Sequence, residues 1–153
     1  MNSFPRSPNA KVGGLVWFAR MLSKVRLNDA CELPDDYKAN LGVGYDGWCL
    51  RFLSVEYPAL VQRIREGGTD VEILEWCVTH GRRPTDIEIE TWNDCIRKRG
   101  WRDEANGGTE KLNRYKQEYG LGQRDDIETF FDLYDVDEGR EPHRTSGPLR
   151  HDI

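Results

Sequence analysis

The part of the sequence that decides the fold is residues 69–100, which read TDVEILEWCVTHGRRPTDIEIETWNDCIRKRG. It contains one start signal twice, as Thr69-Asp70-Val71-Glu72 and as Thr85-Asp86-Ile87-Glu88. In each, the Thr hydroxyl can accept a hydrogen bond from a free amide of the first helical turn, while the Glu reaches back to the Thr amide. Apolar residues then recur every three or four positions until Gly81 and Gly100 end the runs. The segment therefore predicts two amphipathic helices joined by a turn.

The same helical periodicity continues on both sides of this segment. Apolar residues at three- and four-residue steps predict further helices over residues 12–28, 48–54, 57–64 and 112–119. A third start signal, Asp125-Asp126-Ile127-Glu128, has Asp in the position of the Thr and predicts one more helix. No stretch shows the sustained alternation of a β-strand.

These patterns predict an all-α fold, a single-domain bundle of six or seven short helices. Residues 1–10 are expected to form an N-terminal arm and residues 11–140 the helical domain. From about Val136 onward, Gly, Pro, His and Arg dominate and apolar residues nearly vanish. Residues 141–153 are therefore expected to form a flexible, disordered C-terminal tail.

Composition limits the classes of protein to which the chain can belong. Its 153 residues are 37% hydrophobic and 32% charged, with a formal net charge of −5. The longest apolar run, Leu15–Ala19, is too short to span a bilayer or to form the core of a signal peptide. Residues 1–28 contain basic but no acidic residues, as a transit peptide does, yet their apolar spacing is that of a packed helix. We therefore expect a cytoplasmic protein with no membrane partner.

The four cysteines also indicate a reducing compartment. Cys31, Cys49, Cys77 and Cys95 are widely spaced and form no CxxC pair, so neither a disulfide framework nor a zinc site is predicted. Cys77 and His80 lie three residues apart on one predicted helix, a spacing that permits a thiolate–imidazole pair. Because Cys77 falls on the apolar stripe of that helix, a buried, inert thiol is the favoured interpretation. We predict no metal and no cofactor.

The basic residues around Trp101 raise the question of nucleic-acid binding. The cluster consists of Arg97, Lys98, Arg99 and Arg102. Aromatic residues among cations are typical of single-strand binding, but three of these cations lie in the last turn of a predicted helix, where exposed carbonyls favour them. The same helix carries several acids and would meet DNA phosphates with the wrong sign. We therefore exclude DNA as a partner and disfavour RNA.

Residues 42–47, which read GVGYDG, match the GxGxxG pattern of dinucleotide-binding loops. That pattern binds pyrophosphate only where a buried strand leads into it and a long helix follows. Residues 37–41 do not have the composition of a central strand. A glycine-rich connecting loop is the favoured interpretation.

The last predicted helix carries a stripe of carboxylates at Glu128, Asp132 and Asp135. Like charges at these spacings repel by about 0.2–0.5 kcal/mol per pair, so a compensating charge is expected nearby. Arg20 and Lys24, one turn apart on the first predicted helix, are the expected partners. Three interpretations stay open: ion pairing, which is favoured, a site for a polar ligand, and a metal ion, for which no His or amide ligand is evident.

Three parts of the sequence together resemble a known family. They are Leu15–Lys24 with its Gly-Gly lead-in, the segment from Trp92-Asn93 to Arg99-Gly100, and the closing motif FDLYDVDEGR at residues 131–140. They resemble a bacterial family of small proteins of unknown function, domain of unknown function 5069, over roughly residues 9–140. The resemblance implies a small helical cytoplasmic protein, and it implies no activity.

Two functions are consistent with these observations. The first is a non-enzymatic binding or protein-interaction module, which uses a polar groove or an exposed aromatic surface. The second is a small enzyme or ligand-binding domain that acts on a polar, anionic metabolite. The partner is then a protein or a small polar metabolite, and the sequence assigns no catalytic residue. The candidate ligand-binding residues are Arg20, Lys24, Trp92, Asn93, Asp132 and Asp135.

Overall fold

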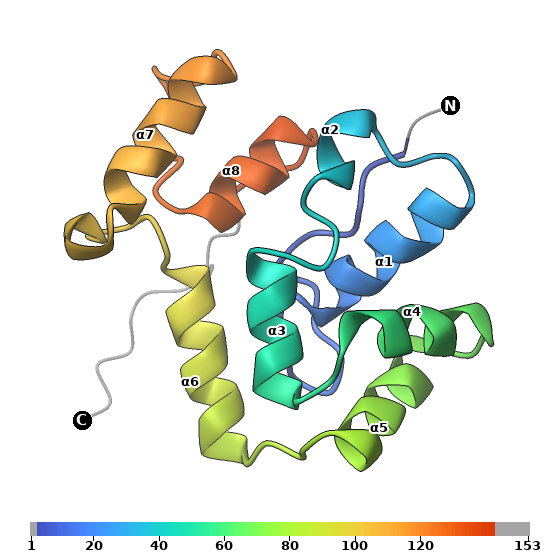
Figure 1. Cartoon of the computed structure of the whole chain (residues 1–153). Helices are drawn as coiled ribbons and strands as arrows, with labels where there is room; N and C mark the ends of the chain where they lie inside the picture. Colours follow the sequence, from blue (N-terminus) through green and yellow to red (C-terminus); the bar gives the residue numbers. More distant parts are fainter. Residues whose placement is uncertain (1–2, 143–153) are drawn as a thin grey trace. The chain divides into compact units, whose positions relative to one another are not determined.

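The computed structural model describes residues 3–142, and within them the fold is all-α (Figure 1). The helices are α1 (Phe18–Asp29), α2 (Asp35–Lys38), α3 (Tyr45–Leu53), α4 (Tyr57–Arg65), α5 (Asp70–His80), α6 (Asp86–Arg97), the 3-10 helix η1 (Glu104–Asn106), α7 (Gly108–Glu118) and α8 (Phe130–Asp137). The all-α prediction is confirmed, and the described residues contain no β-strand. The sequence patterns did not predict two short elements, the single turn α2 and the 3-10 helix η1.

The helices fall into two compact units, and the boundary between the units lies between Arg97 and Lys98. Unit 1 contains α1 to α6, and unit 2 contains η1, α7 and α8. The proposed limits of the arm, the helical domain and the tail stay predictions. Residues 143–153, most of the predicted tail, lie outside the described residues.

The core of unit 1 is built around α1, which packs against α3 and α4 (Figure 1). Its buried apolar residues are Phe18, Ala19, Met21, Leu22 and Val25. Two cations, Arg20 and Lys24, are buried on the same helix. A buried charge is costly unless it is paired or hydrogen-bonded, so the surroundings of these two side chains determine whether the core is stable.

Two of the three predicted start signals form capping boxes. At α5, the Glu72 amide donates to Thr69 Oγ1 at 3.2 Å, and the Thr69 amide donates to Glu72 Oε2 at 2.7 Å. The Thr85 hydroxyl and the Glu88 carboxylate make the same two bonds at α6. These reciprocal bonds satisfy free amides of each first turn, which is why both helices start where the sequence predicts.

The third predicted start signal is wrong. The last helix, α8, begins at Phe130, and its capping box is formed by Thr129 and Asp132. The carboxylate of Asp126, inside the predicted signal, is held by two hydrogen bonds from the Arg124 guanidinium, both 2.8 Å long. The predicted capping residue, Asp125, lies with Asp126 in a turn before the helix, and the first turn of α8 forms four residues further on than predicted, with Thr129 as its cap.

The first helix also starts later than predicted, at Phe18 and not near Val12. Gly13 and Gly14 adopt positive φ angles of 56° and 79°, which end any helical continuity. A Cβ on Gly13 would lie 2.6 Å from Leu74 Cδ2, so this position also needs glycine for close packing against α5. Residues 12–17 are therefore a turn that lies on the core.

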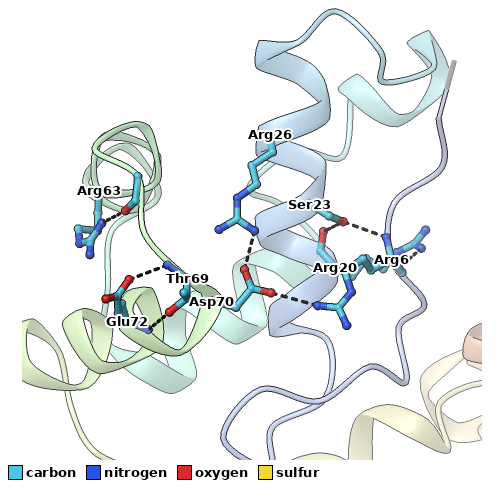
Figure 2. Close-up of polar contacts among 9 residues, drawn as sticks. Arg6, Arg20, Ser23, Arg26, Arg63, Thr69, Asp70 and Glu72 are labelled. Atoms are coloured by element: carbon cyan, nitrogen blue, oxygen red, sulfur yellow. Dashed lines mark hydrogen bonds and ion pairs between the residues drawn. The ribbon is translucent and has the colours of Figure 1, made fainter. Parts of the chain in front are cut away.

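The N-terminal segment runs along α1 and is tied to it by hydrogen bonds (Figure 2). The Arg6 amide donates to Ser23 Oγ at 2.9 Å, and Arg20 Nη1 donates to the Arg6 carbonyl at 2.9 Å. The Asp70 carboxylate accepts from Arg6 at 3.0 Å and from Arg26 at 2.5 Å, so it links the segment, α1 and the start of α5. Both arginines are substantially exposed, and these two ion pairs therefore contribute modestly to stability.

Candidate functional site

The two predicted cations, Arg20 and Lys24, lie over one indole ring in unit 1. The Arg20 guanidinium is 5.5 Å and the Lys24 ammonium 5.3 Å from the centre of the Trp17 ring. Both side chains are buried, with 2% and 4% of their residue surface exposed. Lys24 Nζ lies 2.7 Å from Asp46 Oδ2, so this lysine has a buried carboxylate partner within its own unit.

Asp46 is the centre of this buried cluster, and the sequence analysis did not identify it as the partner of Lys24. It is 1% exposed and accepts hydrogen bonds from Trp17 Nε1 at 2.8 Å and from the Gly42 amide at 3.1 Å. A Cβ on Gly42 would lie 2.7 Å from the Tyr57 ring, so only glycine fits where the loop passes that ring. The glycine-rich segment 42–47 thus contains the carboxylate that pairs with Lys24. The residues before it form α2 and a turn, whereas a dinucleotide site needs a strand there.

Trp17 itself has a strained backbone, with φ 74° and ψ −38°. A positive φ is rare for a bulky residue and costs roughly 1–3 kcal/mol. Its amide donates to the Pro8 carbonyl at 3.0 Å and its indole N–H to Asp46. These bonds and the burial of the ring hold the strained conformation in place.

The predicted ligand-binding residues Trp92 and Asn93 hold the turn that precedes α1. Asn93 Oδ1 accepts from the Val16 amide at 3.0 Å, and Asn93 Nδ2 donates to the Gly14 carbonyl at 2.8 Å. Trp92 Nε1 donates to the Val16 carbonyl at 3.2 Å. The polar groups of both side chains are thus bonded to backbone 76 to 79 residues away in sequence.

The other predicted residues, Asp132 and Asp135, belong to α8 in unit 2. Asp132 Oδ2 accepts from the amides of Glu128 and Thr129 at 3.0 and 3.2 Å, which is the capping bond of the helix. Asp135 Oδ1 lies 3.0 Å from Arg140 Nη1. Glu128 precedes the helix, so the predicted stripe of three carboxylates on one helix is wrong. The FDLYDVDEGR motif is thus a capped helix whose final arginine pairs with two of its own acids, Asp135 and Glu138.

The cysteines in the core do not have the properties of a nucleophile. Burial raises the pKa of Cys77 to about 12. Burial, together with the nearby Asp46 and Cys77, raises the pKa of Cys49 well above its ordinary value. His80 stacks on Trp76, with ring centres 4.7 Å apart, and its Nδ1 is 2.9 Å from the Trp76 carbonyl. Neutral buried thiols are poor nucleophiles, which disfavours the Cys77–His80 pair as a catalytic site.

Neither a cluster of potential metal ligands nor a membrane-spanning helix occurs in the described part of the chain. Among residues 3–142, no three His, Cys, Asp or Glu side chains are grouped so that they could hold a metal ion. Over the same residues, no helix combines the length and the apolar composition needed to cross a membrane.

The loop between α6 and α7 in unit 2 is built on a second buried carboxylate, Asp103, which is 8% exposed. Asp103 Oδ2 accepts from Arg99 Nε at 2.6 Å and from the Gly100 amide at 3.1 Å, and Oδ1 accepts from Asn106 Nδ2 at 2.9 Å. The Thr109 hydroxyl closes the loop by accepting from the Asp103 amide at 2.7 Å and donating to the Gly100 carbonyl at 2.9 Å. Burial alone would raise the pKa of Asp103, but the hydrogen bonds that its carboxylate accepts from Arg99, Asn106 and the Gly100 amide hold the pKa below its ordinary value.

This rigid loop presents Trp101 and Arg102 to solvent. Trp101 is 45% exposed, and the Arg102 guanidinium lies 4.9 Å from the centre of its ring. Arg102 has a φ of 46°, a left-handed conformation that is uncommon outside glycine. The sequence pattern also places Trp101 among cations, but three of those cations were interpreted as residues that end the helix.

The outer side of α7 carries a second combination of rings and cations. Tyr115 and Tyr119 stack with ring centres 6.1 Å apart, and Tyr119 is 45% exposed. Lys111 Nζ and Arg114 Cζ lie 5.5 and 5.7 Å from the centre of the Tyr115 ring. The aromatic side chains of this helix are therefore flanked by exposed positive charge.

Comparison with known proteins identifies the family of the chain. The model of the family described as Domain of unknown function (DUF5069) matches residues 2–140. No curated protein matches the sequence. The sequence motifs resemble the family from about residue 9 onward. The match begins earlier, at residue 2, and so includes the N-terminal segment that lies along α1. Because the match spans nearly the whole sequence, the chain belongs to the family described as Domain of unknown function (DUF5069).

Proposed function

We propose that this protein is a non-enzymatic binding module that engages its partner through the α6–α7 loop, residues 98–109, with Trp101 and Arg102 as the central contacts. The observation that carries the proposal is the exposure of an Arg-stacked tryptophan on a loop held by a buried carboxylate. Trp and Arg are the residues most often found at the centres of protein interfaces, because each offers a large area and a specific polar group.

The rigidity of the loop supports this role. Binding is weakened by the cost of ordering flexible side chains and loops, and a loop already fixed by hydrogen bonds avoids most of that cost. The left-handed conformation of Arg102 is a strained feature at an exposed position, and such strain is concentrated at functional sites. Within the buried cluster of unit 1, by contrast, the charged groups are bonded to one another and to backbone.

The proposal includes a cytoplasmic location. All four cysteines are free, and two of them, Cys31 and Cys95, are exposed. Free exposed thiols persist most readily in a reducing compartment.

The test is a comparison of retained material. The full chain, Trp101→Ala and Arg83→Ala are immobilised, and each is exposed to the same cell extract, from which bound protein and bound nucleic acid are recovered separately. Arg83 is an exposed cation of the α5–α6 turn, paired with Glu75, and its replacement is a control for the loss of an exposed side chain far from the loop in sequence. At least one component should be retained by wild type and Arg83→Ala and lost with Trp101→Ala. Identical retention by all three proteins would contradict the proposal.

A second candidate function is favoured by the two cations over Trp17. In this alternative, Arg20 and Lys24 hold a polar, anionic metabolite, which is the second of the two functions considered from the sequence. The buried position of both cations beside one ring would make an electrostatic contact strong. A screen of anionic metabolites by thermal shift tests it, since a ligand that binds only the folded state raises the melting temperature. A rise seen with wild type and abolished by Arg20→Lys would support this candidate, and no rise with any compound would exclude it for the compounds tested.

A further inference from the structure

We infer that the partner recognised by the α6–α7 loop is single-stranded RNA. This inference rests on the proposed function, because it uses Trp101 and Arg102 as contacts and adds the outer side of α7. It revises the sequence-based preference against RNA, which rested on three of the four cations near Trp101 as residues that end the helix. In the structure Arg102 lies outside α6 and stacks on Trp101.

The exposed aromatic rings of this surface offer flat faces on which unpaired bases can stack. Trp101 and Tyr119 are each 45% exposed, and Tyr115 stacks on Tyr119 with an angle of 16° between the ring planes. Bases stack on such flat rings with little dependence on sequence, because every base has a π-face. In a duplex the bases are already stacked, so these rings offer it nothing comparable.

The charged part of the surface matches the phosphate backbone. Arg102 lies 4.9 Å from the Trp101 ring, and Lys111 and Arg114 lie 5.5 and 5.7 Å from the Tyr115 ring. All three cations are exposed. Each exposed ring therefore has a cation beside it or beside its stacked neighbour, so a base and its phosphate can be met together.

The two ring-and-cation groups belong to one packed part of unit 2. A Cβ on Gly100, the neighbour of Trp101, would lie 2.9 Å from Leu112 Cδ2 and 3.2 Å from the Phe130 ring. The Phe130 ring in turn contacts Tyr115 edge-on, with ring centres 6.2 Å apart. Gly100, next to Trp101 in sequence, and the Tyr115 ring thus both lie against the Phe130 ring, and we expect one single strand to contact both groups.

Acidic side chains near the three cations should reduce the electrostatic contribution to binding. Exposed acids, namely Glu104, Glu110 and Glu118, occur in the same segment as the three cations. The electrostatic contribution is therefore small, and stacking should dominate. With three phosphate contacts, the logarithm of the binding constant should fall with the logarithm of salt concentration with a slope of about −2.

The experiment is fluorescence anisotropy with a labelled oligouridylate of about ten nucleotides, a length within the usual site size of single-strand binding proteins, titrated with the full chain at low salt. Saturable binding is expected. Trp101→Ala should weaken it about tenfold, and Arg102→Ala should weaken it and make the salt slope less steep. Phe4→Ala and Arg83→Ala, which remove an exposed ring and an exposed cation elsewhere, should leave the affinity unchanged. Circular dichroism melts of all variants confirm that the fold is retained.

Three results would overturn the inference: no binding of the oligouridylate by wild type, equal affinity for a duplex of the same length, or unchanged affinity of Trp101→Ala. Binding of polyglutamate but not of the oligouridylate, again dependent on Trp101, would assign the surface to an acidic protein segment and would also overturn it. If the oligouridylate fails but a protein from the extract is retained only by chains with Trp101, the inference falls and the proposed function stands. If nothing is retained through Trp101, both fall.

Discussion

Trp17 in unit 1 and Trp101 in unit 2 have similar neighbours, but the Trp17 side chain is buried and the Trp101 side chain is exposed. Each has an arginine over its ring, Arg20 at 5.5 Å and Arg102 at 4.9 Å. A non-glycine residue with a positive φ occurs at each site: it is Trp17 itself in unit 1 and Arg102, the neighbour of Trp101, in unit 2. Yet Trp17 is 3% exposed and Trp101 is 45% exposed.

The difference lies in what the nearby buried carboxylate binds. Asp46 accepts the indole N–H of Trp17 and pairs with Lys24, so it holds the ring and the cations inside the core. The bonds of Asp103 go to Arg99, to Asn106 and to backbone, so it fixes the loop and leaves the ring of Trp101 at the surface. A buried carboxylate thus stabilises a core in one unit and a presented side chain in the other.

The largest expected effect is on the buried cluster. Asp46→Ala takes from Lys24 its 2.7 Å partner and leaves the Trp17 indole N–H and the Gly42 amide without their acceptor. We expect a loss of about 3–5 kcal/mol in the free energy of unfolding, measured by urea denaturation. The double variant Asp46→Leu with Lys24→Met should recover part of that loss, because no charge of the pair stays buried. A loss below about 1 kcal/mol, as for a solvated pair, would show that the cluster is not desolvated.

The next effect concerns the carboxylate of the loop. Asp103→Ala should cost about 2–3 kcal/mol at neutral pH, because charge-assisted hydrogen bonds are removed and buried donors are left. The pKa of Asp103 is lowered in the folded protein below the ordinary 3.8, so its ionised form stabilises the fold above that value. This stabilisation should be lost as the pH falls through the lowered folded pKa. Relative to Asp103→Asn, wild type should therefore be more stable at neutral pH, and the difference should shrink under acid conditions. A difference that is constant with pH would refute the role given to the charge.

A smaller effect should distinguish the two strained positions. Arg102→Gly should be about 1 kcal/mol more stable than Arg102→Ala, because glycine adopts a φ of 46° without steric cost. Trp17→Gly should instead be strongly destabilising, since relief of strain cannot offset the loss of a buried indole. Thermal melts of the three variants measure both differences. Equal stability of Arg102→Gly and Arg102→Ala would mean that the left-handed conformation carries no strain.

The smallest effect on stability is expected for Trp101→Ala, within about 0.5 kcal/mol of wild type, because an exposed side chain outside the core contributes little to folding. Its urea unfolding curve should overlay that of wild type while partner binding is lost. A drop of several kcal/mol would show that Trp101 is part of a core, and the comparison with Trp17 would no longer hold.

The helices were predicted best where the determining residues are neighbours in sequence. The capping boxes at Thr69 and Thr85 were found because the hydroxyl and the carboxylate that make them are three residues apart. The third box failed because Asp125, its predicted capping residue, lies in a turn four residues before Thr129, which caps the helix, and a pattern of capping residues does not decide between two starts so close in sequence. The start of α1 was placed too early, since apolar spacing continues through a turn whose two glycines lie against another helix.

For the candidate site, the sequence identified the residues but not their partners. Arg20 and Lys24 were placed on one face because helical spacing requires it, and both lie over Trp17. The spacing of residues did not connect Lys24 with Asp46, although the Asp46 carboxylate is its buried partner. Trp101 was recognised as an aromatic residue among cations, but its exposure depends on how Asp103 folds the loop, and spacing alone does not give that.

By itself, the sequence determined the features that depend on residues within about one helical turn: the all-α class, the apolar face of each helix, two capping boxes and the glycines that end helices. Only the tertiary structure decided which charges meet and which rings are buried. Trp17 and Asp46 are 29 residues apart, and Val16 and Asn93 are 77 apart. Contacts over such separations depend on how whole helices pack, because many acids in a chain could pair with a given lysine, and only packing brings one of them within 3 Å and removes the water around it.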